Sequence, residues 1–227
     1  MRGLRIWCQI RYTVSDTQDL TRRRPLPSLP RQIMAYAETL PEGAPICPSA
    51  LLHMGNRAAI DQALSRLARR EQLLRVCRGV YVRPIETEFG VRAPSVDKVI
   101  AALSALWGET IVPSGGAAAN VLRLTTQVPI QSVYLTSGPT RTLTLFAQVI
   151  RLRHAPRWQL VAPGRPAGLA VRAMAFLGPN EVEDGLGAIR QSLTQRDLDE
   201  LAATRAILPS WLAEPISGLV QSRANAR

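Results

Sequence analysis

Apolar residues recur at helical spacing along residues 31–40, and the pattern then breaks at a Pro-Glu-Gly turn. A short helix is expected to open near Pro48, and Asn56 is a good N-cap for a longer helix running to about Gln72. The apolar positions of that longer helix form one stripe, which consists of Ile60, Ala63, Leu64 and Leu67. The spacing therefore predicts three helices, of which the longest has one face turned to a core.

The pattern changes to alternation after the long helix. Residues 73–76 and 80–82 alternate around Arg78-Gly79, where glycine supplies the positive φ of a tight turn. Helix, short helix, long helix and hairpin in this order are typical of a winged helix-turn-helix. We therefore predict that residues 31–85 form a winged helix-turn-helix DNA-binding domain, with residues 86–94 as the connection to a second domain.

Both periodicities occur in the second half of the chain. Helical spacing covers residues 95–106, 167–177, 181–193 and 195–206, and a small helix is expected after Ser114. Strand-like segments cover residues 109–112, 133–136, 142–145 and 149–153. The predicted fold class is α+β, with residues 95–220 as a mixed α+β C-terminal domain.

Charge indicates the class of partner. The chain has 28 basic and 17 acidic residues, which gives a net charge of +11. Such an excess favours a polyanionic partner, nucleic acid before a membrane surface. Residues 1–30 are rich in proline and arginine and are expected to form a disordered arm. This arm is either a basic segment that contacts phosphates or sequence upstream of the natural start.

Cysteines and histidines argue against a disulfide framework or a metal site. Cys8, Cys47 and Cys77 are scattered without a C-x-x-C pair, and His53 and His154 have no partner at metal-ligand spacing. We therefore expect reduced thiols, a cytoplasmic protein and neither metal nor cofactor. No apolar run is long enough to cross a membrane, and the arginines near the N-terminus leave no room for a secretory signal.

The polar face of the helix at 56–72 has the chemistry of a major-groove surface. Opposite its apolar stripe lie small or hydrogen-bonding side chains, those of Ala58, Gln62, Ser65 and Arg69. Gln62 is the candidate for base readout, since its amide can pair bidentately with adenine. Arg57, Arg66 and Arg69 suit phosphates or a guanine. The alternative is an amphipathic helix whose polar face meets only water.

Two arginines of the predicted hairpin extend this surface. Arg75 lies on the first strand and Arg78 at the turn, and hairpin wings commonly touch the neighbouring DNA backbone or minor groove. Residues 56–83 hold seven arginines against two acids. The helix face and the hairpin together therefore predict contact with double-stranded DNA.

Four segments together resemble a known family. They are NRAAIDQALSRLARREQLLRVCRGVYVRP (56–84), VPSGGAAANVLRLTTQVP (112–129), VYLTSGPTRTLTL (133–145) and RHAPRW (153–158). With these motifs the chain resembles the AbiEi-type antitoxins of type IV toxin–antitoxin systems over about residues 31–200.

The resemblance implies a winged helix that binds inverted repeats in its own promoter, and hence a transcriptional autorepressor that acts as an antitoxin. It implies operator contacts from Gln62, Ser65, Arg66 and Arg69, and backbone contacts from Arg75 and Arg78. It also implies a functional link to a nucleotidyltransferase toxin without a stable complex. Inverted repeats fit dimerisation or cooperative assembly on DNA.

Two other functions stay open. One is a protein-interaction antitoxin that neutralises its partner by direct binding. The other is a nucleic-acid-modifying enzyme near Ser114–Asn120, where Gly115-Gly116 opens a helix that could hold a phosphate. No P-loop or dinucleotide motif accompanies this turn, and no nucleophile is placed beside His154. We therefore expect a structural turn that packs the helix on the sheet, a structural histidine and no enzyme.

Trp211 is expected either to pack in the core or to anchor a partner helix or second subunit.

Overall fold

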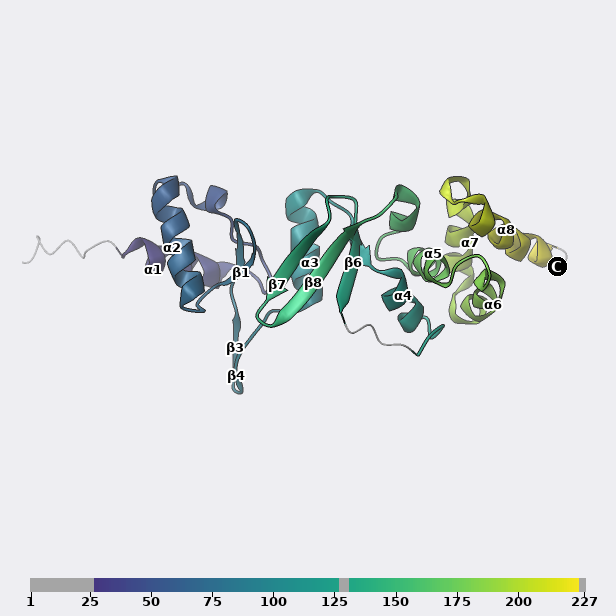
Figure 1. The fold of residues 1–227 in the computed structure, drawn as a ribbon, viewed down its shortest axis with the longest axis horizontal. Helices are drawn as coiled ribbons and strands as arrows, with labels where there is room; N and C mark the ends of the chain where they lie inside the picture. Colours follow the sequence, from purple (N-terminus) through teal and green to yellow (C-terminus); the bar gives the residue numbers. More distant parts are fainter. Residues whose placement is uncertain (1–26, 127–130, 225–227) are drawn as a thin grey trace, which may run out of the picture.

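The computed structural model describes residues 27–126 and 131–224, so most of the arm expected at residues 1–30 lies outside the described residues. Helices and strands both contribute to the fold, which confirms the predicted α+β class. Figure 1 shows the first helices at one end of an elongated molecule, a sheet in the middle and a group of helices at the other end. Except for the short helix at residues 115–121, which packs beside the C-terminal helices, these parts follow one another in space in the order of the chain.

Three helical elements and a hairpin form the N-terminal part, as the spacing predicts. They are α1 (Leu29–Thr39), the 3-10 helix η1 (Pro48–Leu51), α2 (Arg57–Arg69), β1 (Leu74–Cys77) and β2 (Val80–Val82). The apolar stripes of α1 and α2 share one core cluster with Ile46 and Tyr81. Ile46 and Tyr81 also exchange backbone hydrogen bonds of 2.7 and 3.0 Å, so the segment between α1 and η1 adds a bridge to the hairpin.

Helix α2 ends earlier than its apolar pattern predicts. The expected end near Gln72 is three residues too late, because Glu71 adopts a left-handed φ of 58°. The backbone amides of Glu71 and Gln72 donate to the carbonyl oxygens of Ala68 and Leu67, at 3.1 and 3.0 Å. This is the Schellman arrangement, which closes a helix and turns the chain towards the hairpin.

A second hairpin follows where the sequence predicts only a connection. β3 (Ile85–Thr87) and β4 (Gly90–Arg92) pair antiparallel, and Phe89 in the turn between them is fully exposed. The hairpin projects from the body of the molecule (Figure 1). Its strands bury no side chain completely, so the apolar alternation that marks a strand in a sequence is missing here.

One helix and four strands form the central part. They are α3 (Val96–Trp107), β5 (Ile111–Pro113), β6 (Ser132–Thr136), β7 (Arg141–Leu145) and β8 (Gln148–His154), close to the predicted segments. The sheet has the order β5-β6-β8-β7, with β6 and β8 parallel and the other pairs antiparallel. Because β6 and β8 are parallel, their carboxyl ends meet at the same edge of the sheet.

The hairpin β1–β2 shares a core with the central sheet. One face of the hairpin, formed by Leu74, Val76, Val80 and Val82, is buried against α3, β7 and β8. The residues of those elements in the same cluster are Val99, Ile100, Leu103, Leu143, Leu145, Ile150 and Leu152. The two domains predicted on either side of residues 86–94 are therefore joined by a common apolar layer.

Helices make up the C-terminal part. They are α4 (Gly115–Val121), η2 (Arg157–Leu160), α5 (Pro166–Leu177), α6 (Val182–Ser192), α7 (Gln195–Ala203), η3 (Thr204–Ile207) and α8 (Ser210–Ala224). Helix α5 contacts α4, α6 and α7, and Thr194 with Asp197 forms the capping box of α7. Among the described residues, no helix combines the length and the apolar character needed to span a membrane.

Gly115 has the structural role that the sequence predicts, but against a different partner. A Cβ at Gly115 would lie 2.6 Å from the carbonyl oxygen of Arg172 and 2.8 Å from Cβ of Phe176, both on α5. The glycine therefore lets α4 approach α5 closely. The expectation that it serves packing on the sheet is wrong, because α5 occupies the face of α4 that the glycine leaves open.

Candidate nucleic-acid interface

The local sequence of α2 fixes which of its faces meets solvent. Asn56 Oδ1 accepts a hydrogen bond of 2.8 Å from the backbone amide of Ala59, which confirms Asn56 as the N-cap. The predicted apolar stripe of Ile60, Ala63, Leu64 and Leu67 is buried. The opposite face is consequently held towards solvent by the packing of the helix.

That solvent face presents the candidate residues. Gln62, Arg66 and Arg69 are exposed, and Ser65 is half-buried beside them. Neither Arg66 nor Arg69 forms an ion pair with any described residue, whereas Arg57 binds Asp61 through a 3.0 Å contact one turn away. The face therefore offers two unneutralised guanidinium groups and one amide, and Arg57 is partly neutralised by its neighbour.

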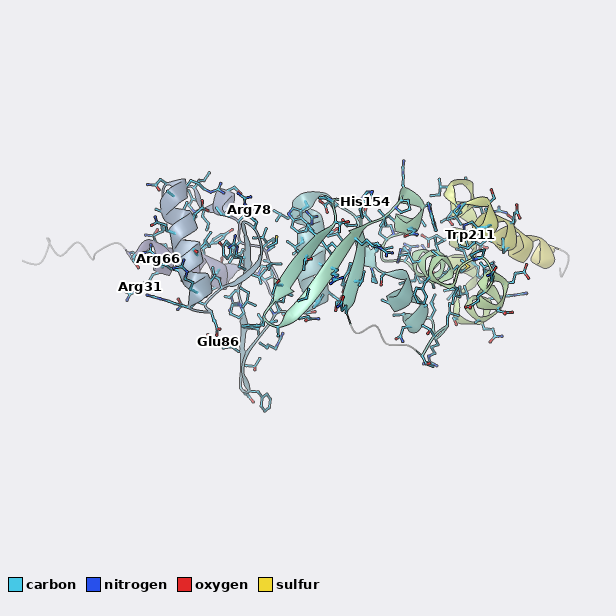
Figure 2. All side chains as sticks on the ribbon, viewed as in Figure 1. Arg31, Arg66, Arg78, Glu86, His154 and Trp211 are labelled. Atoms are coloured by element: carbon cyan, nitrogen blue, oxygen red, sulfur yellow. The ribbon has the colours of Figure 1, made fainter. Side chains whose placement is uncertain are left out.

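The hairpin carries the other two predicted contacts. Arg75 is exposed on β1 opposite Tyr81, and Arg78 is exposed at the turn, where Gly79 has a φ of 74°. Figure 2 shows Arg66 near the outer end of the molecule and Arg78 at the hairpin turn, nearer the central sheet. The seven candidate residues thus lie on two elements, α2 and the hairpin that follows it.

Glu42, in the loop after α1, ties this unit to the start of the central part. Its carboxylate accepts hydrogen bonds from Arg92 at 3.1 Å, from the backbone amide of Ser95 at 3.0 Å and from Lys98. These contacts, with that of Lys98 the largest, lower the pKa of Glu42 from its usual 4.5 to about 2. No sequence signal marks Glu42, because its partners lie fifty or more residues away along the chain.

Residues that the sequence singled out in the second half make structural contacts. His154 Nδ1 lies 2.9 Å from the carbonyl oxygen of Gly138, as expected of a structural histidine. The ring of Trp211 packs edge-on against Trp158, with 6.4 Å between their centroids, and both border the core of the C-terminal helices. Trp211 thus packs inside the chain, which is one of the two roles expected for it.

The thiols of Cys47 and Cys77 are free. Burial raises the pKa of both thiols, which opposes formation of a reactive thiolate. Within residues 27–126 and 131–224, no group of three or more His, Cys, Asp or Glu side chains is placed to hold a metal ion.

Comparison with known proteins gives a family. No curated protein matches the chain. The matched family model covers residues 32–201, from within α1 to within α7, and so includes the candidate surface, the sheet and most of the C-terminal helices. The chain belongs to the family of unknown function DUF6088.

Proposed function

We propose that residues 29–82 form a winged helix-turn-helix that binds double-stranded operator DNA, and that the protein is a transcriptional autorepressor. The solvent face of α2 carries this proposal, because Gln62, Arg66 and Arg69 are exposed there and neither arginine is ion-paired with a described residue. A helix with such a face fits the width and the hydrogen-bonding pattern of the major groove.

The order and contacts of the elements support a winged helix. Both α1 and η1 contact α2, and the hairpin β1–β2 follows α2 directly. The isolated β-bridge between Ile46 and Tyr81 pairs the segment before η1 with strand β2 of the hairpin. In this arrangement the helix before the hairpin enters the major groove, and the hairpin lies against the adjacent backbone.

The chemistry of each side chain assigns its role in this complex. Gln62 reads a base, because an amide donates and accepts in one plane. Arg66 and Arg69 neutralise phosphates that flank the groove, and Arg75 and Arg78 do so beside it. Phosphate contacts supply most of the affinity and base contacts supply the preference for one sequence.

A gel-shift titration on the protein's own upstream promoter fragment tests the proposal. The competitor is scrambled DNA of equal length at near-physiological salt. We expect binding to the promoter to be tighter by about a hundredfold or more, within the range of specific repressors. Equal binding to both duplexes, or no binding, would contradict the proposal.

Two pairs of variants distinguish the effect of the proposed interface on DNA binding from the effect of the overall charge of the chain. Replacing Arg66 and Arg69 by alanine should weaken binding to both duplexes, because each arginine contributes a phosphate contact. Replacing Arg190 and Arg196, exposed on α6 and α7, removes the same charge at the far end of the molecule and should leave binding unchanged. Equal losses from both pairs would show a general effect of charge.

The resemblance to AbiEi-type antitoxins extends the proposal to antitoxin activity. A nucleotidyltransferase encoded beside this chain would be the toxin. We expect that co-expression of this chain restores the growth of cells that express this toxin, although the two proteins do not copurify. Copurification would instead support direct neutralisation of the toxin by binding. Failure to restore growth would leave the repressor function and remove the antitoxin function.

A further inference from the structure

A cavity of about 790 Å³ opens where the central sheet meets the C-terminal helices. Its lining comes from the edge at which the parallel strands β6 and β8 end, from the segment 157–163 and from α7 and η3. Figure 2 shows His154 at the carboxyl end of β8, next to η2. Clefts at the carboxyl ends of parallel strands commonly bind ligands, and this volume suits a small organic molecule.

Two basic side chains, His154 and Arg157, line the cavity together with one acid and three hydroxyl side chains. His154 Nδ1 donates to the carbonyl oxygen of Gly138 at 2.9 Å, which fixes the ring and leaves Nε2 without a partner among the described residues. Arg157 is exposed in the lining and is not ion-paired within the described chain. The acid of the lining, Glu200, is neutralised by Arg165 at 3.1 Å. An anion in the cavity therefore meets two unneutralised cationic or hydrogen-bonding groups.

A buried cation lies behind one wall of the same cavity. Arg172 on α5 is only 1% exposed, and Nε and Nη2 of its guanidinium have no hydrogen-bond partner among the described residues. Within the described part of the chain, Nη1 donates one long hydrogen bond of 3.5 Å to the carbonyl oxygen of Val161, a residue of the cavity lining. Burial lowers the pKa of Arg172 to about 10, so the side chain stays charged at neutral pH. A buried charge without a counter-ion is costly, and an anion on the far side of the wall would reduce that cost.

The wall between Arg172 and the cavity is held firmly in place. Ala162 adopts a left-handed φ of 43°, which a non-glycine residue keeps only under constraint. A Cβ at Gly168 would lie 2.2 Å from the carbonyl oxygen of Ala162 and 2.4 Å from that of Val161, so α5 presses on this loop backbone to backbone. The position of the wall is therefore fixed before any ligand binds, and preorganisation of this kind favours affinity.

We propose that this cavity binds a small organic anion, a phosphate or carboxylate group attached to an apolar ring or chain. His154 and Arg157 hold the anionic group, and the charge of Arg172 adds attraction from behind the wall. Leu160, Val161 and Ile207 in the lining contact the apolar part. Such a ligand would connect the sheet to α7 and η3, so binding would also stabilise the contact between these two parts. This site goes beyond the proposed DNA binding and does not depend on it.

Calorimetric titration of the full chain with three probes of similar size tests the proposal. They are phenyl phosphate, benzoate and the neutral benzyl alcohol. We expect saturable binding of at least one anion with a dissociation constant of about 1 mM or below, and none of benzyl alcohol. Binding of phenyl phosphate alone identifies a phosphate ester as the ligand class, and binding of benzoate alone identifies a carboxylate. Binding of neither anion, or binding of benzyl alcohol as tight as that of the anions, overturns the proposal.

Variants locate the binding to the cavity. Replacing His154 and Arg157 together by alanine should weaken anion binding at least about tenfold, because both side chains are exposed in the lining. Arg151→Ala is the matched control, since Arg151 is an exposed arginine of the same strand β8 outside the lining, and it should bind as the wild type does. Equal weakening in the control overturns the assignment to this cavity.

Arg172→Met gives a second and independent measurement. Removing a buried charge without a counter-ion should raise the thermal midpoint of the unliganded protein, and the same change should weaken anion binding. An unchanged dissociation constant, or a lower thermal midpoint in a folded variant, would remove Arg172 from the site. If this variant does not fold, the His154 and Arg157 variant still decides whether the cavity binds the anion.

Discussion

The salt dependence of DNA binding tests the hairpin arginines most directly. Arg75 and Arg78 are exposed and form no ion pair with described residues, so each can neutralise a phosphate without losing another partner. Replacing both by alanine removes two cations and leaves the buried face of the hairpin unchanged. We expect weaker binding at low salt and a smaller response to added salt.

The expected salt dependence of DNA binding follows from the number of arginines that have no ion pair. Four arginines of the proposed interface, Arg66, Arg69, Arg75 and Arg78, have no ion pair in the described part of the chain. Each phosphate contact contributes about −0.9 to the slope of log K against log salt concentration, so four contacts give about −3.6 per protomer. The double variant should show about −1.8. Arg57 is not counted, since Asp61 already partly neutralises it.

Fluorescence anisotropy of a labelled operator duplex at several salt concentrations measures this slope. The variant with alanine at Arg190 and Arg196 is the control, because it loses the same charge outside the proposed interface. The reasoning is refuted if the hairpin variant keeps the wild-type slope, or if the control loses as much of the slope as the hairpin variant.

Three further predictions concern single residues. Gln62→Ala should remove the sequence preference at one base pair of the operator, which costs about 1–3 kcal/mol of binding free energy at that position. Competition with single-base variants of the operator measures this loss. Uniformly weaker binding to all duplexes would contradict base readout. Asn56→Ala should lower the free energy of unfolding by about 0.5–2 kcal/mol in urea denaturation. Ser95→Ala is the control and should change the free energy of unfolding little, since Ser95 occupies a cap position without a side-chain cap bond. Equal losses of stability in the two variants would contradict the capping role of Asn56. Because the pKa of Glu42 is lowered from 4.5 to about 2 in the folded state, the ionised carboxylate stabilises the fold above pH 4.5, and this stabilisation disappears as the pH falls towards 2. Urea denaturation of the wild type and of Glu42→Gln over this pH range should show that the difference in their free energies of unfolding shrinks on acidification. A difference that grows would contradict the role of Glu42.

The elements that the sequence predicts correctly are those that local signals specify. Asn56 caps α2 through its own side chain, and the apolar stripe of α2 is buried as its spacing requires. Gly79 and Gly108 adopt the positive φ that the turn and the helix end need. Exposure of Gln62, Arg66 and Arg69 follows from the same spacing, since burying one face of a helix exposes the opposite one.

The features that the sequence does not reveal depend on residues distant along the chain. The parallel pairing of β6 with β8 leaves no local pattern, because a parallel partner can come from any later strand. Glu71 ends α2 in a left-handed conformation that glycine or asparagine would have signalled. The cavity is invisible in the sequence for the same reason, since His154, Arg157 and Ile207 come together only when η3 packs near the end of the sheet.

The common core of hairpin and sheet decides how the proposed DNA-binding unit can be studied. A chain cut after residue 92 keeps α1, α2 and both hairpins, but it exposes the side chains of Leu74, Val76, Val80 and Val82, of which none is more than 7% exposed in the intact protein. Burial of one such side chain is worth about 1.5–3 kcal/mol, and a whole domain is stable by only about 5–15 kcal/mol. The shortened chain should therefore be unfolded or aggregated, whereas a chain ending after β8 keeps the layer covered and should retain DNA binding. Circular dichroism and urea denaturation of both fragments measure this difference. A fragment of residues 27–92 that unfolds at the same urea concentration as the full chain would show that the hairpin does not need the sheet, and the two predicted domains would then be independent.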